Sequence, residues 1–187
     1  MASGALPLLV PLLLTSSAQG FCYEDGAPPG HTGGFDEPDC SLCHSDGDKN
    51  SPEGTLQVDG LPDEYSPGKR YELAVVLRHP ELRSGGFQLA LRSANGKSAG
   101  ELTPASDRLR PVAVAGNTYL QHSTEGGRPT AEGAIEWVFH WTAPTDAGAQ
   151  EKAPVYLHVA ANAANNDVSA LGDYVFTLER VLRKKSE

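Results

Sequence analysis

The part of the chain after Gly54 consists of short apolar runs separated by turn residues. In three of these runs every second residue is large and apolar: Tyr71, Leu73, Val75 and Leu77; Ile135, Trp137, Phe139 and Trp141; and Val155, Leu157 and Val159. Such alternation indicates half-buried β-strands, and no stretch keeps a helical period for more than two turns. We therefore expect an all-β fold whose core is formed by these faces.

Seven or eight short strands are expected between clusters of Pro, Gly, Asn and Asp. Their ranges are 54–60, 70–79, 85–94, 110–116, 118–123, 134–143, 154–163 and 172–183. This spacing, with no amphipathic helix, is typical of an antiparallel immunoglobulin-like β-sandwich. We expect the sandwich domain to span residues 55–187, behind an irregular loop region at residues 21–54.

Composition narrows the class of function. The 187-residue chain has a net charge of −9 and no basic stripe, so it lacks the cationic surface that drives nucleic-acid binding. The serine next to His122, in "HSTEGG", offers no Gly-x-Ser-x-Gly elbow, and the chain has no phosphate-binding loop or His-Glu-x-x-His helix. We expect an electron carrier or a binding protein, and not an enzyme.

Residues 1–20 are predicted to be a secretory signal peptide. They carry no charge, are apolar from Ala5 to Leu14, and end in an Ala18-x-Gly20 cleavage pattern. The apolar run is too short for a membrane-spanning helix, which needs about 20 residues. We expect export to the periplasm, the cell surface or the medium, with no transmembrane segment in the mature chain.

The segment from Phe21 to Gly54 is rich in Gly, Pro, Asp and Ser, so it needs something other than a core to hold it. It contains Cys40-Ser-Leu-Cys43-His44, which has the spacing of a c-type haem attachment site. Cys40 and Cys43 would form thioethers with the two vinyl groups of one haem, and His44 would bind the iron.

Two other interpretations of this motif stay open. The first is a disulfide or a dithiol between Cys40 and Cys43, which would leave Cys22 unpaired. The second is a zinc site that recruits Cys22 and His31 as further ligands, although these spacings fit no common zinc finger.

The ligand on the other side of the iron is also open. Met1 is the only methionine and leaves with the signal peptide, so ligation by His and Met is excluded. The candidates are His31, in the same irregular segment, His122, at the end of a predicted strand, or no residue at all. His140 and His158 fall on the strand faces expected to meet solvent.

Four ordered blocks of the chain resemble a known family: "GAPPGHTGGFDEPDCSLCHSD", "GLPDEYSPGKRYELAVVL", "GGFQLALRS" and "HVAANAANNDVSALGDYVFT". Together they resemble bacterial exported proteins that carry a reelin-like (Reeler) domain behind a Cys-x-x-Cys-His loop. The resemblance implies a Reeler-type β-sandwich in which "YSPGKRY" opens a strand, "GFQL" lies in a central strand and "AANAANND" is a loop. It also implies that His31 and His122 are positioned features.

The combined prediction is an exported mono-haem c protein that exchanges electrons with an unidentified redox partner protein. Reeler domains elsewhere are extracellular binding or adhesion modules. The alternative prediction is therefore a binding module in which Cys40 and Cys43 form a structural disulfide.

Overall fold

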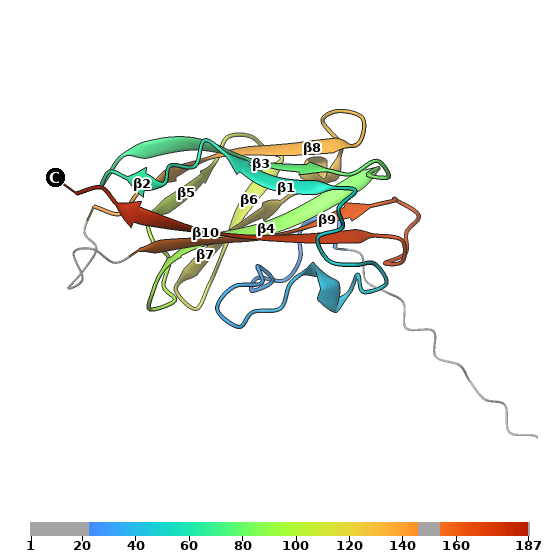
Figure 1. Cartoon of the computed structure of the whole chain (residues 1–187), viewed down its shortest axis with the longest axis horizontal. Helices are drawn as coiled ribbons and strands as arrows, with labels where there is room; N and C mark the ends of the chain where they lie inside the picture. Colours follow the sequence, from blue (N-terminus) through green and yellow to red (C-terminus); the bar gives the residue numbers. More distant parts are fainter. Residues whose placement is uncertain (1–22, 146–153, 187) are drawn as a thin grey trace, which may run out of the picture.

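Two β-sheets packed face to face make up the structure (Figure 1). The computed structural model describes residues 23–145 and 154–186, so the predicted signal peptide and Cys22 lie outside the described residues. The strands are β1 (Thr55–Asp59), β2 (Glu64–Tyr65), β3 (Arg70–Arg78), β4 (Ser84–Ser93), β5 (Glu101–Pro104), β6 (Leu109–Val114), β7 (Asn117–His122), β8 (Ala134–Thr142), β9 (Val155–Ala164) and β10 (Tyr174–Lys184). Two short 3-10 helices, η1 (Cys40–Leu42) and η2 (Glu125–Gly127), accompany them.

The expected β-sandwich is confirmed, and each expected strand is present. One sheet has four strands in the order β1-β3-β8-β5, and the other has six in the order β2-β10-β9-β4-β7-β6. The strand containing "GFQL" is central in the larger sheet, as the resemblance implied. Within the described ranges, no helix is long and apolar enough to cross a membrane.

Two strands were not anticipated, β2 and β5. Strand β2 is two residues long and pairs in parallel with β10, with Glu64 opposite Arg183. Strand β5 pairs with β8 at the edge of the smaller sheet and ends at Pro104. Both strands are too short to show an alternation of apolar and polar residues in the sequence. They form because each pairs with a strand that is distant in the sequence.

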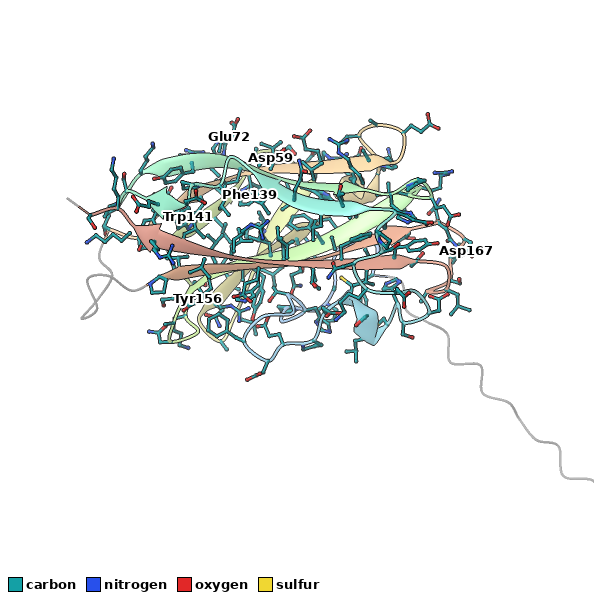
Figure 2. The ribbon with its side chains drawn as sticks, in the orientation of Figure 1. Asp59, Glu72, Phe139, Trp141, Tyr156 and Asp167 are labelled. Carbon is teal, nitrogen blue, oxygen red and sulfur yellow. The ribbon has the colours of Figure 1, made fainter. Side chains whose placement is uncertain are left out.

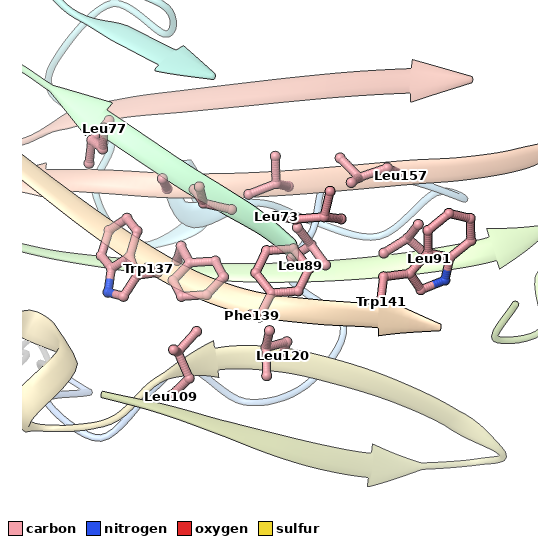
Figure 3. Packing of buried hydrophobic residues seen from close by; sticks show 14 of the residues in the cluster. Leu73, Leu77, Leu89, Leu91, Leu109, Leu120, Trp137, Phe139, Trp141 and Leu157 are labelled. Carbon is pink, nitrogen blue, oxygen red and sulfur yellow. The ribbon is translucent and has the colours of Figure 1, made fainter. Parts of the chain in front are cut away.

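The predicted apolar faces meet between the two sheets and form one core. Figure 2 shows Phe139 and Trp141 pointing between the layers, whereas Asp59 and Glu72 lie on the outer side of the smaller sheet. Strands β3 and β8 run antiparallel with Leu73 opposite Phe139. Figure 3 shows the packed cluster, whose largest fully buried members include Trp137, Trp141, Phe139, Leu73, Leu89, Leu91, Leu120 and Leu157. Each such side chain contributes about 1.5–3 kcal/mol by burial.

The outer face of the larger sheet is covered as well. The N-terminal segment, defined here as residues 23–54, runs beneath β9 and β4 in Figure 1. Ala90 and Ala160 on that face are fully buried, and Gln88 and Asn162 are 1% and 7% exposed. The central strands are therefore buried on both faces.

This covering changes two sequence expectations. His158 was expected to face solvent, but it is 8% exposed because Phe35 packs edge-on against its ring. A Cβ at Gly34 would collide with the same ring, so the segment approaches closely only because residue 34 is glycine. The "AANAANND" block was expected to be a loop, yet β9 continues to Ala164, because Gly85 and Gly86 of β4 extend the pairing.

Phe139→Ala is expected to lower the free energy of unfolding by about 3–5 kcal/mol, because it leaves a cavity in the core. Urea denaturation followed by tryptophan fluorescence measures this change. The matched control is Glu136→Ala, at an exposed position of the same strand, which should change stability by less than about 0.5 kcal/mol. Equal losses in both variants would contradict the assigned core.

Candidate functional site

A cavity of about 440 Å³ lies between the N-terminal segment and the outer face of the larger sheet. Its size falls within the range of small-molecule and cofactor sites, about 300–1,000 Å³. All five residues predicted from the sequence line it: Cys40, Cys43, His44, His31 and His122. The structure therefore brings together residues that span 91 positions of the chain.

The two cysteines are presented by η1. The carboxylate of Asp39 caps this turn by accepting from the Ser41 amide at 2.8 Å. The amide of His44 donates to the Cys40 carbonyl at 3.0 Å, which places the histidine directly after the turn. Lys49 in turn binds Asp39 at 2.6 Å. The motif is therefore held in a compact turn, in which Cys40 is half-buried and Cys43 is exposed.

His44 is oriented by a carboxylate far away in the sequence. Its Nδ1 lies 2.7 Å from Oδ2 of Asp173, which is 1% exposed and directly precedes β10. A carboxylate accepts the proton of Nδ1 and leaves Nε2 with a free lone pair. Metal-binding histidines almost always donate their other ring nitrogen in this way.

Asp173 is itself held by two donors. Asn162 Nδ2 donates to its Oδ2 at 3.1 Å, and the Asn165 amide donates to its Oδ1 at 3.1 Å. Asn162 Oδ1 is buried with no hydrogen-bond partner among the described residues, and Asn162 lines the cavity. A buried unpaired acceptor costs about 1–3 kcal/mol. Asp173 and Asn162 are not predictable from the sequence, since nothing local links them to a motif more than 100 positions away.

His31 lies in a turn that Gln88 holds from the sheet. Gln88 Oε1 accepts from the amides of Gly30 and His31 at 2.8 and 2.7 Å. Its Nε2 donates to the Pro28 carbonyl at 3.0 Å. The same carbonyl lies 2.9 Å from Nδ1 of His31, which makes Nδ1 the protonated nitrogen. In His31, as in His44, the hydrogen bond uses Nδ1 and leaves Nε2 with a free lone pair.

His122 contributes a wall of the cavity from the end of β7. It is 8% exposed, and a Cβ at Gly86 would collide with its ring. Its Nδ1 lies 3.1 Å from the amide nitrogen of Phe87 and 3.3 Å from the carbonyl of the same residue. Burial lowers the pKa of His122 below its ordinary value.

One carboxylate fastens the N-terminal segment to the sheet. Glu37 accepts from Arg92 at 2.6 Å, from the hydroxyl of Tyr119 at 2.5 Å and from Thr32 at 2.6 Å. Burial alone would raise the pKa of Glu37, but the bonds from Arg92, Thr32 and Tyr119 hold it below its ordinary value of 4.5. Burial and the bond to Glu37 raise the pKa of Tyr119 to about 12.

The turn before Glu37 is conformationally costly. Phe35 and Asp36 both have positive φ angles, 54° and 62°, which cost a non-glycine residue about 1–2 kcal/mol each. Phe35 packs edge-on against Tyr156 and lies 5.3 Å from the guanidinium of Arg92. These contacts and the Glu37 bonds offset the strain.

The alternative interpretations of the cysteines find no support among the described residues. Cys40 and Cys43 are free thiols. Burial, with the charge of Asp39, raises the pKa of the Cys40 thiol to about 12, so it is protonated at neutral pH and unlike a redox dithiol. Residues 23–145 and 154–186 contain no group of three or more His, Cys, Asp or Glu side chains that could hold a metal ion. Cys22, which the zinc interpretation required, lies outside the described residues.

Comparison with solved structures identifies the fold. The Reelin-N domain of F-spondin aligns with 78% of this chain and 97% of its own length, with a TM-score of 0.50 and 19% identity. This chain has a reeler-type fold. The human F-spondin reeler domain aligns with 78% of this chain and 98% of its own length, at 20% identity and a TM-score of 0.48. At these identities the reeler-type likeness concerns the fold alone. No family model and no curated protein matches the sequence.

Glu37→Gln is expected to lower the free energy of unfolding by about 3 kcal/mol, because it leaves the buried Arg92 guanidinium without a counter-charge. The control is Glu125→Gln, whose pair with Arg128 is exposed and should matter by less than about 1 kcal/mol. Urea denaturation at neutral pH measures both.

The same pair predicts a pH dependence. Because the folded-state pKa of Glu37 lies below its ordinary value of 4.5, its stabilisation is complete above that value. It is lost as the pH falls through the folded-state pKa. The stability difference between the wild type and Glu37→Gln should therefore shrink below pH 4.5, and a constant difference would contradict the assignment.

Proposed function

We propose that this protein is an exported carrier of one covalently attached haem, which sits in the cavity beneath the larger sheet. Cys40 and Cys43 would form the two thioether bonds, and the Nε2 of His44 would bind the iron. The apolar run in residues 1–20 supports export, which is also where c-type haem is attached in bacteria. Electron exchange with a partner protein is the activity that follows.

The observation that carries the proposal is the contact between His44 and Asp173. An ordinary surface histidine has no need of a carboxylate that is 1% exposed. A ligand to a metal does, because the carboxylate selects the tautomer, fixes the ring and raises the basicity of the other nitrogen. The same histidine lines one cavity with both thiols of the motif.

The residues present fit this cofactor. The cavity offers two thiols, imidazole nitrogens and the unpaired oxygen of Asn162. Ala27, Pro28 and Leu42 supply apolar walls, and Gly85 and Gly86 leave part of the sheet face without side chains. A bound haem supplies uptake and release of one electron at iron, with no bond made or broken in a substrate.

The protein's own groups have separate tasks. Asp173 holds the proton on Nδ1 of His44, and Asn162 holds Asp173. The Glu37 and Gln88 contacts keep the N-terminal segment docked on the sheet, so the cavity stays formed. Hydrogen bonds and solvent exposure around a haem are among the factors that set its reduction potential.

The comparisons favour a second candidate, an extracellular binding module without a cofactor. One solved neighbour is the Reelin-N domain of F-spondin, and that fold supports a recognition role more directly than electron transfer. In this candidate the cysteines remain thiols, since no disulfide joins Cys40 to Cys43. The two candidates differ in whether the exported protein carries haem.

The test is to express the full chain together with haem-maturation machinery and to purify the exported product. The wild type should show a haem mass on intact-mass analysis, a Soret band that survives acid-acetone and a haemochrome spectrum in pyridine. Cys40→Ala combined with Cys43→Ala should lose all three and keep the fold, because Cys40 is only half-buried and Cys43 is exposed.

The matched control is Ser41→Ala, which changes the same turn without removing a thiol and should keep the haem. A wild-type product that contains only apoprotein, while a known c-type cytochrome matures in the same cells, overturns the proposal. That result would support the binding module.

Asp173→Asn is expected to keep the covalent haem but to raise its reduction potential. The negative charge next to His44 favours the ferric state, and asparagine removes that charge while keeping an oxygen in place. Spectroelectrochemical titration measures the potential. Asp167→Asn, at an exposed carboxylate in the same loop between β9 and β10, serves as the control and should leave the potential close to that of the wild type.

A further inference from the structure

We propose that the second iron ligand is His31, so that the site is closed on both sides by imidazole. This inference rests on the proposed function. Three histidines of the described residues line the cavity, His31, His44 and His122. With His44 assigned to the attachment motif, the choice lies between His31, His122 and an open position.

His31 has the arrangement that a ligand requires. Its Nδ1 donates to the Pro28 carbonyl at 2.9 Å, which leaves the lone pair on Nε2. A backbone carbonyl is, with a carboxylate, the usual partner of the non-coordinating nitrogen. His44 has the equivalent arrangement with Asp173. Two histidines on one cavity therefore share the same tautomer.

The turn that carries His31 is also fixed in position. Gln88 is 1% exposed and makes hydrogen bonds to Gly30, His31 and Pro28, which are all in this turn. A buried side chain that binds three backbone groups between Pro28 and His31 holds the turn against the sheet. The imidazole is thereby presented at a defined place, as the preorganisation of a site demands.

His122 differs in its shorter contact, which is with a donor. The Phe87 amide donates to its Nδ1 at 3.1 Å, and the Phe87 carbonyl lies farther away at 3.3 Å. Its ring also makes a backbone hydrogen bond with Tyr23. Its ring rests on Gly86. Coordination would require His122 to give up contacts in a place that is 8% exposed. We assign it to the wall of the cavity.

Closure by two imidazoles restricts what the protein can do. An iron with both axial positions filled by histidine has no position open for a small gas or peroxide. Within the proposed function, two histidine ligands therefore favour electron transfer over ligand sensing or peroxide chemistry. It also assigns a role to the turn that carries His31, which lies before the attachment motif.

The test uses the full exported holoprotein and compares His31→Ala with His122→Gln. The readouts are the electronic absorption and electron paramagnetic resonance spectra of the ferric protein and the binding of carbon monoxide to the ferrous protein. The wild type should be low-spin and should not bind carbon monoxide readily. His31→Ala should become high-spin and bind it, and added imidazole should restore the low-spin spectrum.

His122→Gln should remain low-spin, because glutamine keeps a polar group near Phe87 and no ligand is lost. A low-spin His31→Ala protein, or a high-spin His122→Gln protein, overturns the assignment of His31. A wild type that is high-spin overturns the closed site. The failure of the proposed function is distinct, because it would give no covalent haem in any of these proteins.

Discussion

The buried ion pair between Glu37 and Arg92 holds the N-terminal segment in place, and the cavity exists only because that segment is docked. Residues 23–54 include no strand and bury little apolar surface of their own. Arg92, at 2% exposure, needs a counter-charge, and Glu37 supplies it at 2.6 Å. A buried pair of this kind adds little net stability over an apolar contact, but breaking it is costly. It therefore specifies where the segment lies.

Apolar packing stabilises the sandwich, and buried polar contacts position the cavity residues. The space between the sheets is filled by large apolar side chains, which hold the sandwich together without reference to the cavity. The outer face of the larger sheet carries buried polar residues, Gln88, Arg92 and Asn162, at positions that a simple two-layer sandwich would expose. Each of them binds a group of the N-terminal segment or a residue that orients His44. The sheet thus serves as the floor of the site.

The sandwich was predictable from sequence because its signal is local. Alternation in β3, β8 and β9 identified the core faces, and the turn residues separated the strands. The five cavity residues were also found by motif and by resemblance. The residues that position them were not: Asp173 is 129 positions from His44, Gln88 is 57 from His31, and Arg92 is 55 from Glu37. A lone Asp, Gln or Arg on a strand has no local pattern that reveals its distant partner. The burial of His158 was missed for the same reason, since it depends on Gly34 and Phe35.

The distance along the chain between His44 and Asp173 bears on the order in which the site is assembled. The thiols and the imidazole emerge early in synthesis, whereas the orienting carboxylate directly precedes the last strand, which completes the larger sheet. The motif can therefore be present and reactive in a nascent polypeptide that has no finished pocket. A group joined to the thiols at that stage would be present as the final strand docks, whereas a group arriving later would have to enter a site that the sheet and the N-terminal segment already form.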